Sequence, residues 1–309
     1  MAKKMIDFNK NFKKIVIVYL AIFLVGVVLA LVLGVKLDIN FKGGARITYA
    51  YTGEIAEKDV QSALGDVIKE KYTVTKSTSI AGDTKTISLN LVGNKGISTK
   101  VQEDITKKLT EKFKDNKIEL YDSNSVSPTI AGSFFLKSLV AVVIAAAFVV
   151  LYVGVRFRKI GGVSAGMTAL VALVFDVLIT FFVCVFFRLQ IDSNYIAVVL
   201  TILGYSLNDT IVTFDRVREN RKLYPEDDLA ESVNKSINMT LIRNVITSVT
   251  TFVAVLTVVG VAEIFGLTTL RTFGIPMAFG IVSGSVSSLC IAGPLWVIWQ
   301  NKKSKKKAR

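Results

Sequence analysis

Six long apolar stretches dominate the sequence and constrain its fold more than any other feature. They occupy residues 15–35, 134–155, 163–187, 194–214, 243–262 and 272–299. A helix of about 20 apolar residues crosses the roughly 30 Å of hydrocarbon in a bilayer, so each stretch is long enough to span a membrane. The sequence therefore predicts a polytopic α-helical membrane protein with six transmembrane helices.

Composition and charge agree with this class of protein. Hydrophobic residues make up 51% of the chain, and the mean hydropathy is +0.51. The formal charge is +14, but the basic residues form short blocks beside the apolar stretches, which is the pattern set by membrane orientation and anionic headgroups. We therefore expect no nucleic-acid partner. The chain has no histidine, which excludes an imidazole metal site, and no cofactor is expected.

The basic blocks also predict how the spans are oriented. They all fall on one side of the membrane if the six spans alternate, and such blocks mark the cytoplasmic side. Residues 1–14 and the basic tail 300–309 are then cytoplasmic, and residues 36–133 lie outside. The first stretch is longer than the apolar core of a signal peptide and has no small-residue cleavage site after it, so it should remain as a helix.

Residues 36–133 form the one sizeable polar segment, and their pattern predicts a small α+β domain. Strand patterns cover 46–51, 72–79, 86–92 and 118–121, and helical spacing covers 57–70 and 98–114. This β-α-β-β-α-β order is typical of a ferredoxin-like sandwich. The segment has no recognisable catalytic motif. We expect either a protein-contacting surface or a passive cap, and not an enzyme.

Asp209 is the most unusual residue of the fourth stretch. A carboxylate inside a span costs several kcal/mol unless it is paired, hydrated or protonated, which makes it a functional-site hypothesis. Ser206, Asn208 and Thr210 form a polar clump with it. The alternative is that Ser206, Asn208 or Thr213 holds the carboxylate by hydrogen bonds that merely join helices.

Arg243 is the matching cation of the fifth stretch. It lies near the inner start of that span, at a depth similar to that of Asp209, so the two side chains could pair. Thr247, Thr250 and Thr251 follow Arg243 on one helix face and could hydrate an ion path. The alternative is that Arg243 extends to lipid headgroups at the interface.

Asp176 adds a second acidic residue, in the middle of the third stretch. Each intramembrane carboxylate must be compensated separately if it has no shared role. Two such residues on adjacent spans therefore favour an ion relay that contains Asp176, Asp209 and Arg243.

The sequence around Asp209 resembles a known family. Residues 204–220 read Gly-Tyr-Ser-Leu-Asn-Asp-Thr-Ile-Val-Thr-Phe-Asp-Arg-Val-Arg-Glu-Asn and are similar to the fourth-span signature of the SecF protein-export family, which belongs to the resistance-nodulation-division (RND) superfamily. Residues 40–44, with Phe41, Gly43 and Gly44, resemble that family's Asp-Phe-x-Gly-Gly motif, and residues 243–251 resemble its Arg-Thr-Leu-x-Thr-Ser-x-Thr-Thr motif. The similarity covers essentially the whole chain.

The resemblance implies a function and a set of partners. Members of the family pair with a SecD homologue that supplies six further spans, and the pair works with the SecYEG channel in the cytoplasmic membrane of a bacterium. They use the ion gradient, with H⁺ as the expected ion, to draw a preprotein outward. SecA and a YidC-type insertase are further candidate partners.

The resemblance also assigns roles to residues. Asp209 and Arg243 fall on positions tied to proton flow in that family. Asp176 matches the acid of a His-Asp pair, in which Phe175 replaces the His, and Asn40 replaces an Asp of the first motif.

Two other functions remain open at this stage. One is half of an RND-type small-molecule exporter, and the other is a membrane scaffold that couples to no ion. Residues 36–133 are too few to build a drug-sized pocket alone, which favours the export subunit. A scaffold predicts that Asp209→Asn has no functional cost.

Overall fold

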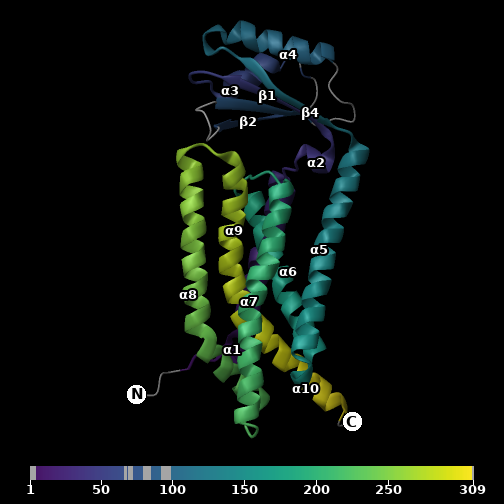
Figure 1. Cartoon of the computed structure of the whole chain (residues 1–309), viewed down its shortest axis with the longest axis vertical. Helices are drawn as coiled ribbons and strands as arrows, with labels where there is room; N and C mark the ends of the chain where they lie inside the picture. Colours follow the sequence, from purple (N-terminus) through teal and green to yellow (C-terminus); the bar gives the residue numbers. More distant parts are fainter. Residues whose placement is uncertain (1–4, 66–67, 69–71, 79–84, 92–98, 308–309) are drawn as a thin grey trace.

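A helical bundle carries a small α+β domain at one end in the computed structural model of the chain (Figure 1). The structure describes residues 5–65, 68, 72–78, 85–91 and 99–307. Within these residues, six helical segments are long and apolar enough to cross a membrane. They are α1 (Phe8–Leu33), α5 (Pro128–Arg156), α6 (Gly162–Phe186), α7 (Ser193–Leu223), α8 (Leu229–Ile264) and a sixth span that begins with α9 (Thr268–Ser287). The predicted six-span architecture is confirmed.

The domain between the first two spans has the predicted ferredoxin-like order of elements. Its four strands form an antiparallel sheet in the order β2-β3-β1-β4, and helices α3 and α4 cover one face. Ile47, Leu64, Leu89 and Ile105 are fully buried between the sheet and these helices. The elements are β1 (Gly44–Tyr51), α3 (Glu57–Leu64), β2 (Tyr72–Thr78), β3 (Lys85–Leu91), α4 (Thr99–Lys112), a 3-10 turn (Lys114–Asn116) and β4 (Glu119–Val126).

Several predicted boundaries differ from the structure. Strand β4 continues to Val126 rather than ending at 121, because it is an exposed edge strand whose polar residues show no alternation. Helix α3 covers Glu57–Leu64 in the described residues. The predicted ends at residues 70, 79, 92 and 98 lie outside the described residues.

The spans extend beyond the apolar stretches. Helix α8 begins at Leu229 rather than at 243, and α7 continues to Leu223 rather than 214. These extensions are polar, so hydropathy does not detect them, but they pack against each other. The buried Asn220 side chain of α7 donates a 2.8 Å hydrogen bond to the Ser236 hydroxyl of α8.

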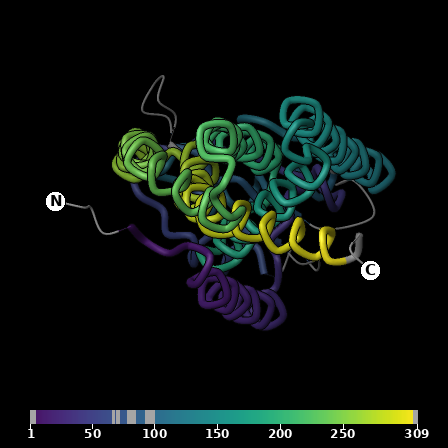
Figure 2. The backbone as a smooth tube through the Cα atoms, turned by 90° about the horizontal axis from the view of Figure 1, so that it is seen from below, coloured from purple at the N-terminus to yellow at the C-terminus, as the bar shows by residue number. Residues whose placement is uncertain are grey.

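The sixth span was predicted as one stretch over 272–299. In the structure it is interrupted and is not a single α-helix. A π-helical turn, η3 (Ser288–Ala292), separates α9 from α10 (Gly293–Lys307). Such turns are rare and frequently lie at functional sites. Figure 2 shows this span crossing the middle of the bundle, with α1 at one side.

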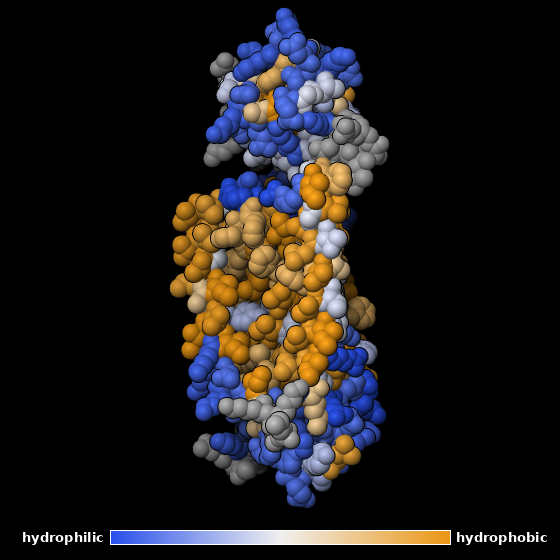
Figure 3. Space-filling model, turned by 90° about the vertical axis from the view of Figure 1, so that its left-hand side faces the viewer, coloured by the Kyte–Doolittle hydropathy of each residue, from blue (hydrophilic) through white to orange (hydrophobic). Residues whose placement is uncertain are grey.

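An apolar band covers the bundle between its two polar ends (Figure 3). Side chains of α1 such as Leu24 and Leu31 are 68% and 81% exposed, which suits contact with lipid. The first and last described helices, α1 and α10, begin and end at the end of the bundle opposite the α+β domain. The side of the membrane on which that domain lies stays a prediction.

Candidate ion-coupling site

Asp176 is held in the middle of the bundle by three serines. It lies on α6 and is fully buried. Its Oδ1 accepts a 2.6 Å hydrogen bond from Ser283, and its Oδ2 accepts bonds of 2.7 Å from Ser206 and 2.9 Å from Ser287. We call Ser206, Ser283 and Ser287 the serine cage. Three donated hydrogen bonds are an arrangement that suits an ionised carboxylate.

The small residues of the sixth span make the serine cage possible. Ser283 and Ser287 are one helical turn apart, so they share a face of α9. Between them is Gly284, where an added Cβ would lie 2.9 Å from the Cβ of Ser206. Because Gly284 has no side chain, α9 can approach α7 closely enough for serines of both helices to reach Asp176.

Asp209 lies on the same face of α7 as Ser206, but its carboxyl group has a different environment from that of Asp176. Its side chain is 2% exposed, and its Oδ2 is buried without a hydrogen-bond partner among the described residues. The Ser248 hydroxyl of α8 lies beside the carboxyl. Thr213 donates to the backbone oxygen of Asp209 rather than to the carboxylate.

The alternative interpretation, in which Ser206, Asn208 or Thr213 holds the Asp209 carboxylate by hydrogen bonds, is therefore not what the structure shows. Ser206 donates to Asp176 instead, and Asn208 is exposed on another face of the helix. Thr210 joins the polar cluster by donating to Ser288 at 2.9 Å, and Ser288 donates to the backbone oxygen of Ser206 at 3.0 Å.

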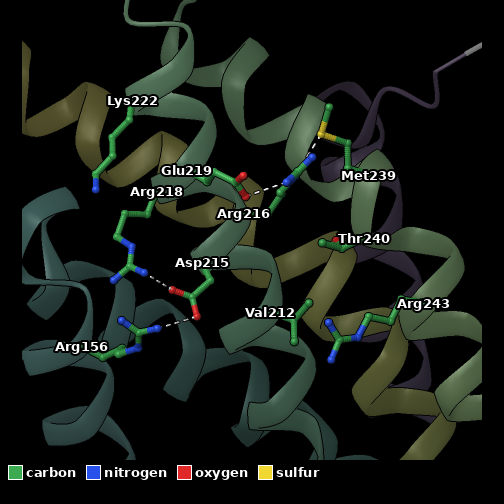
Figure 4. Close-up of a pocket in the computed structure, with 10 residues that line it drawn as sticks. All are labelled: Arg156, Val212, Asp215, Arg216, Arg218, Glu219, Lys222, Met239, Thr240 and Arg243. Carbon is green, nitrogen blue, oxygen red and sulfur yellow. Dashed lines mark hydrogen bonds and ion pairs between the residues drawn. The ribbon is translucent and has the colours of Figure 1, made fainter.

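The predicted pair between Asp209 and Arg243 is also not formed. Within the described residues, the structure records no ion pair for Arg243, whose side chain is exposed and lines a pocket between α5, α7 and α8 (Figure 4). The reason is helical geometry. Asn244 and Ser248, which are buried, occupy the face of α8 turned toward α7, and Arg243 lies about 100° around the helix from Asn244.

The hydroxyls of the threonines that follow Arg243 are bonded within their own helix. Thr247, Thr250 and Thr251 each donate to a backbone oxygen of their own helix, at 2.9, 3.0 and 2.9 Å. The polar groups that α8 buries recur every four residues and are Ser232, Ser236, Thr240, Asn244 and Ser248. A small or polar residue at every fourth position was the signal that could have identified this face.

The Asn-Phe-Lys-Gly-Gly motif forms the junction between α1, the domain and α5. Asp38 caps the short helix α2 (Ile39–Lys42) by accepting from the Asn40 backbone N–H, and Phe41 packs 5.3 Å from Phe134 of α5. Gly43 has a φ of +76°, and a Cβ there would lie 2.9 Å from the Cα of Pro128. Gly44, with a φ of +134°, then starts β1.

Asp38, which sequence reasoning missed, ties this junction to the loop between α6 and α7. It is 1% exposed, forms an ion pair with Arg46 of β1 and accepts a 3.2 Å hydrogen bond from Gln190. Backbone bonds join Ile191 to Lys36 and Asp38, at 2.8 and 3.0 Å. The α+β domain is thus fastened to the connection between the two helices that carry Asp176 and Asp209.

Comparison with known proteins decides the family. Residues 104–302 match the protein family described as "Protein export membrane protein SecD/SecF, C-terminal". The chain is also 31% identical to protein translocase subunit SecF of Alicyclobacillus acidocaldarius, over 94% of this chain and 91% of that protein. The chain belongs to the SecD/SecF family. Within this family it resembles the SecF proteins in length, because it also covers 98% of SecF of Petrotoga mobilis, at 30% identity over 97% of this chain.

Longer relatives exist as well. Protein translocase subunit SecDF of Bacillus subtilis is 34% identical over 97% of this chain, which spans only 39% of that protein. The crystal structure of SecDF from Thermus thermophilus superimposes with a TM-score of 0.80 at 26% identity, over 97% of this chain and 39% of that one. These matches confirm a multi-pass SecF-type protein of protein transport, and such proteins are not enzymes.

No metal centre accompanies the site in the part of the chain that the structure describes. Within it, no group of three or more His, Cys, Asp or Glu side chains is placed to hold a metal ion. Phe175, which stands where the family pattern has a His, packs 5.3 Å from the Tyr19 ring and 5.2 Å from the Phe23 ring of α1. That position is therefore part of an aromatic contact with the first span.

Proposed function

We propose that this chain uses the transmembrane ion gradient, together with a SecD homologue, to promote the translocation of preproteins through the SecYEG channel. In this proposal Asp209 is the residue that takes up and releases the coupling ion, which is H⁺. The carboxyl oxygen of Asp209 that is buried inside a span without a hydrogen-bond partner among the described residues carries the proposal. Such a carboxylate changes its interactions with the bundle when its charge changes.

A series of hydroxyls leads from Asp176 to the face of α7 that carries Asp209, and it supports a proton path toward that residue. The Asp176 carboxylate accepts from Ser206, whose hydroxyl lies 3.4 Å from that of Ser288, and Thr210 donates to Ser288. Ser206 and Thr210 flank Asp209 on one buried face of α7. Hydroxyls both donate and accept hydrogen bonds, so they can pass a proton along such a series.

Arg243 would act by changing partners. In this structure it lies outside the core and makes no ion pair among the described residues, while Asp209 is inside. An ionised Asp209 attracts the guanidinium, and a protonated one does not. Moving one charge through 100 mV is worth about 2.3 kcal/mol, which is enough to bias two helix packings of similar free energy.

The α+β domain would be the part that moves. Because Asp38, Arg46 and Gln190 fasten it to the α6–α7 loop, a displacement of either helix end reaches the sheet directly. If so, cross-linking the domain to the bundle should block export and leave assembly intact. Undiminished export with the cross-link formed would reduce the domain to a passive cap.

A second half would complete the transporter. Transporters of this class are commonly built from two six-span repeats with the site at the repeat interface. The Bacillus subtilis relative is much longer than this chain, and α1, α5 and α8 expose most of their apolar side chains. We therefore propose a SecD homologue as the obligatory partner, with SecYEG, SecA and a YidC-type insertase as further contacts.

The experiment that tests this function is Asp209→Asn in inverted membrane vesicles. Asparagine keeps the shape of the side chain but carries no charge, so the stimulation of preprotein uptake by the ion gradient should fall to the level seen with the gradient collapsed. ATP-driven uptake should persist. Asn208→Ala, at the exposed neighbouring position, is the matched control and should behave as wild type.

Arg243→Met should resemble Asp209→Asn, and the double variant should be no worse than either single one, because members of one relay act as a unit. If Asp209→Asn keeps the full stimulation by the gradient, the carboxylate is structural and the proposal fails. Full export activity from this chain with the channel, in the absence of any SecD homologue, would contradict the proposed partnership.

A further inference from the structure

A basic pocket lies between α5, α7 and α8 at the end of the bundle opposite the α+β domain. Its volume is about 670 Å³. Five cations line it, Arg156 from α5, Arg216, Arg218 and Lys222 from α7, and Arg243 from α8 (Figure 4). Asp215 and Glu219 are the acidic residues of its lining, so the formal charge is five minus two, or +3.

The charges of this basic pocket are unevenly paired. Arg156 and Arg218 both contact Asp215, at 3.0 and 2.9 Å, and Arg216 contacts Glu219 at 2.6 Å. Lys222 and Arg243 make no ion pair within the described residues. The pocket therefore presents two cations without an ion-pair partner, of which Arg243 also lies within electrostatic reach of the Asp209 carboxyl.

The surroundings indicate what kind of anion fits. The pocket lies where α5 ends at Arg156, beside the polar end of α7 and the polar start of α8. Apolar side chains adjoin it on α8, where Ile242 and Ile246 are 54% and 58% exposed. On α5, Val155 is 63% exposed. A ligand with a phosphate and long apolar chains would satisfy both parts of this surface.

We propose that the basic pocket binds the phosphate headgroup of an anionic phospholipid. Basic pockets between membrane helices on the cytoplasmic side commonly hold such headgroups, and arginine donates two parallel hydrogen bonds to phosphate. The apolar flanks favour a lipid over free phosphate or an acidic protein segment, since neither of these has chains to cover Ile242 and Val155. The lipid would contact Arg243, which lies about 100° around α8 from the buried Asn244.

The test measures lipid retention by the purified full-length chain in detergent, by native mass spectrometry. Dioleoyl-phosphatidylglycerol should bind more tightly than dioleoyl-phosphatidylcholine. Each cation near a phosphate contributes about 1 kcal/mol, or about fivefold in affinity. Lys222→Gln should therefore weaken phosphatidylglycerol binding about fivefold, and Lys222→Gln with Arg243→Gln about 25-fold.

The matched control is Lys302→Gln with Lys303→Gln, which removes the same charge from the exposed end of α10 and should change binding less than twofold. Thermal unfolding followed by labelling of the buried Cys184 thiol should be the same for all variants. Because the readout is lipid binding, it is independent of whether Asp209 couples to an ion.

Three results would overturn the proposal. One is equal retention of the two lipids, and another is full retention of phosphatidylglycerol by the double variant. The third is displacement of the lipid by inorganic phosphate or polyglutamate at equal concentration, with the same dependence on Lys222 and Arg243. That result would assign the pocket to a free anion or to an acidic protein segment.

Discussion

Asp176 and Asp209 are both buried carboxylates on neighbouring spans, yet their carboxyl oxygens differ in how fully they are hydrogen-bonded. Asp176 is 0% exposed, and both of its oxygens accept hydrogen bonds from the serine cage. Asp209 is 2% exposed, and one of its oxygens has no partner among the described residues. The first carboxylate is built into the packing of three helices, and the second is left free to change its interactions.

This difference indicates that Asp176 contributes mainly to the stability of the fold and Asp209 mainly to ion coupling. A net hydrogen bond to a charged group contributes about 1.5–3 kcal/mol, so a change at Asp176 disturbs several contacts between α6, α7 and α9. A change at Asp209 disturbs few. If the comparison is correct, Asp176 variants should lose mainly stability, whereas Asp209 variants should lose mainly the response to the ion gradient.

The largest expected effect is that of Asp176→Ala on unfolding. The substitution removes the acceptor that three buried hydroxyls share, and we expect it to lower the free energy of unfolding by about 3 kcal/mol. Asp209→Asn should lower it by less than about 1 kcal/mol. The buried thiol of Cys184, which a maleimide dye labels only after unfolding, provides the measurement. Equal losses of unfolding free energy for the two variants would contradict the proposed difference between the two carboxylates.

Much of the fold could be predicted because its signals are local. Each span can be recognised from its length and apolar composition. The alternation of apolar and polar residues in β1 and β3 follows directly from one buried and one polar face of the sheet. Asp176 and Asp209 were identified as special for a similar reason. A carboxylate inside an apolar stretch can be recognised from the sequence alone, and its cost in hydrocarbon when it is unpaired marks it as a candidate functional residue.

The partners of those carboxylates could not be predicted, because they depend on how helices turn toward one another. Thr247 and Ser248 are adjacent hydroxyl residues, and sequence pattern did not reveal that Ser248 faces α7. The π-helical turn shifts the helical register after Ser287, which brings both Ser287 and Ser288 to the polar cluster. Asp38 was missed because its partners, Arg46 of β1 and Gln190 of the α6–α7 loop, meet it only in the folded chain.

A smaller effect is expected from a methyl group added beside the serine cage. Gly284→Ala would place its Cβ 2.9 Å from the Cβ of Ser206, so α9 must move away from α7 and Ser206 from Asp176. We expect a loss of about 2 kcal/mol in the free energy of unfolding. Gly204→Ala on α7 is the matched control, because nothing lies within 4 Å of its added Cβ.

The control should be neutral or stabilising by up to about 1 kcal/mol, since alanine favours a helix more than glycine does. If Gly284→Ala is as stable as Gly204→Ala, the close approach of α9 to α7 does not hold the serine cage together. Asp176 would then owe its position to contacts other than those with the sixth span.

The smallest expected effect distinguishes the two faces of α8. Ser248 is buried beside Asp209 and accepts a 3.3 Å hydrogen bond from Tyr205, whereas the Thr250 hydroxyl is exposed and bonds to its own helix. If Asp209 couples to the ion, Ser248→Ala should reduce the gradient-dependent part of preprotein uptake about fivefold, because one hydrogen bond to the carboxyl is worth about 1 kcal/mol. Thr250→Ala should leave uptake unchanged.

Both variants should unfold like wild type to within about 1 kcal/mol, so a difference in uptake reports the site rather than the fold. The reverse result, with Thr250→Ala impaired and Ser248→Ala normal, would move the ion path to the exposed face of α8 and return the threonines after Arg243 to the relay.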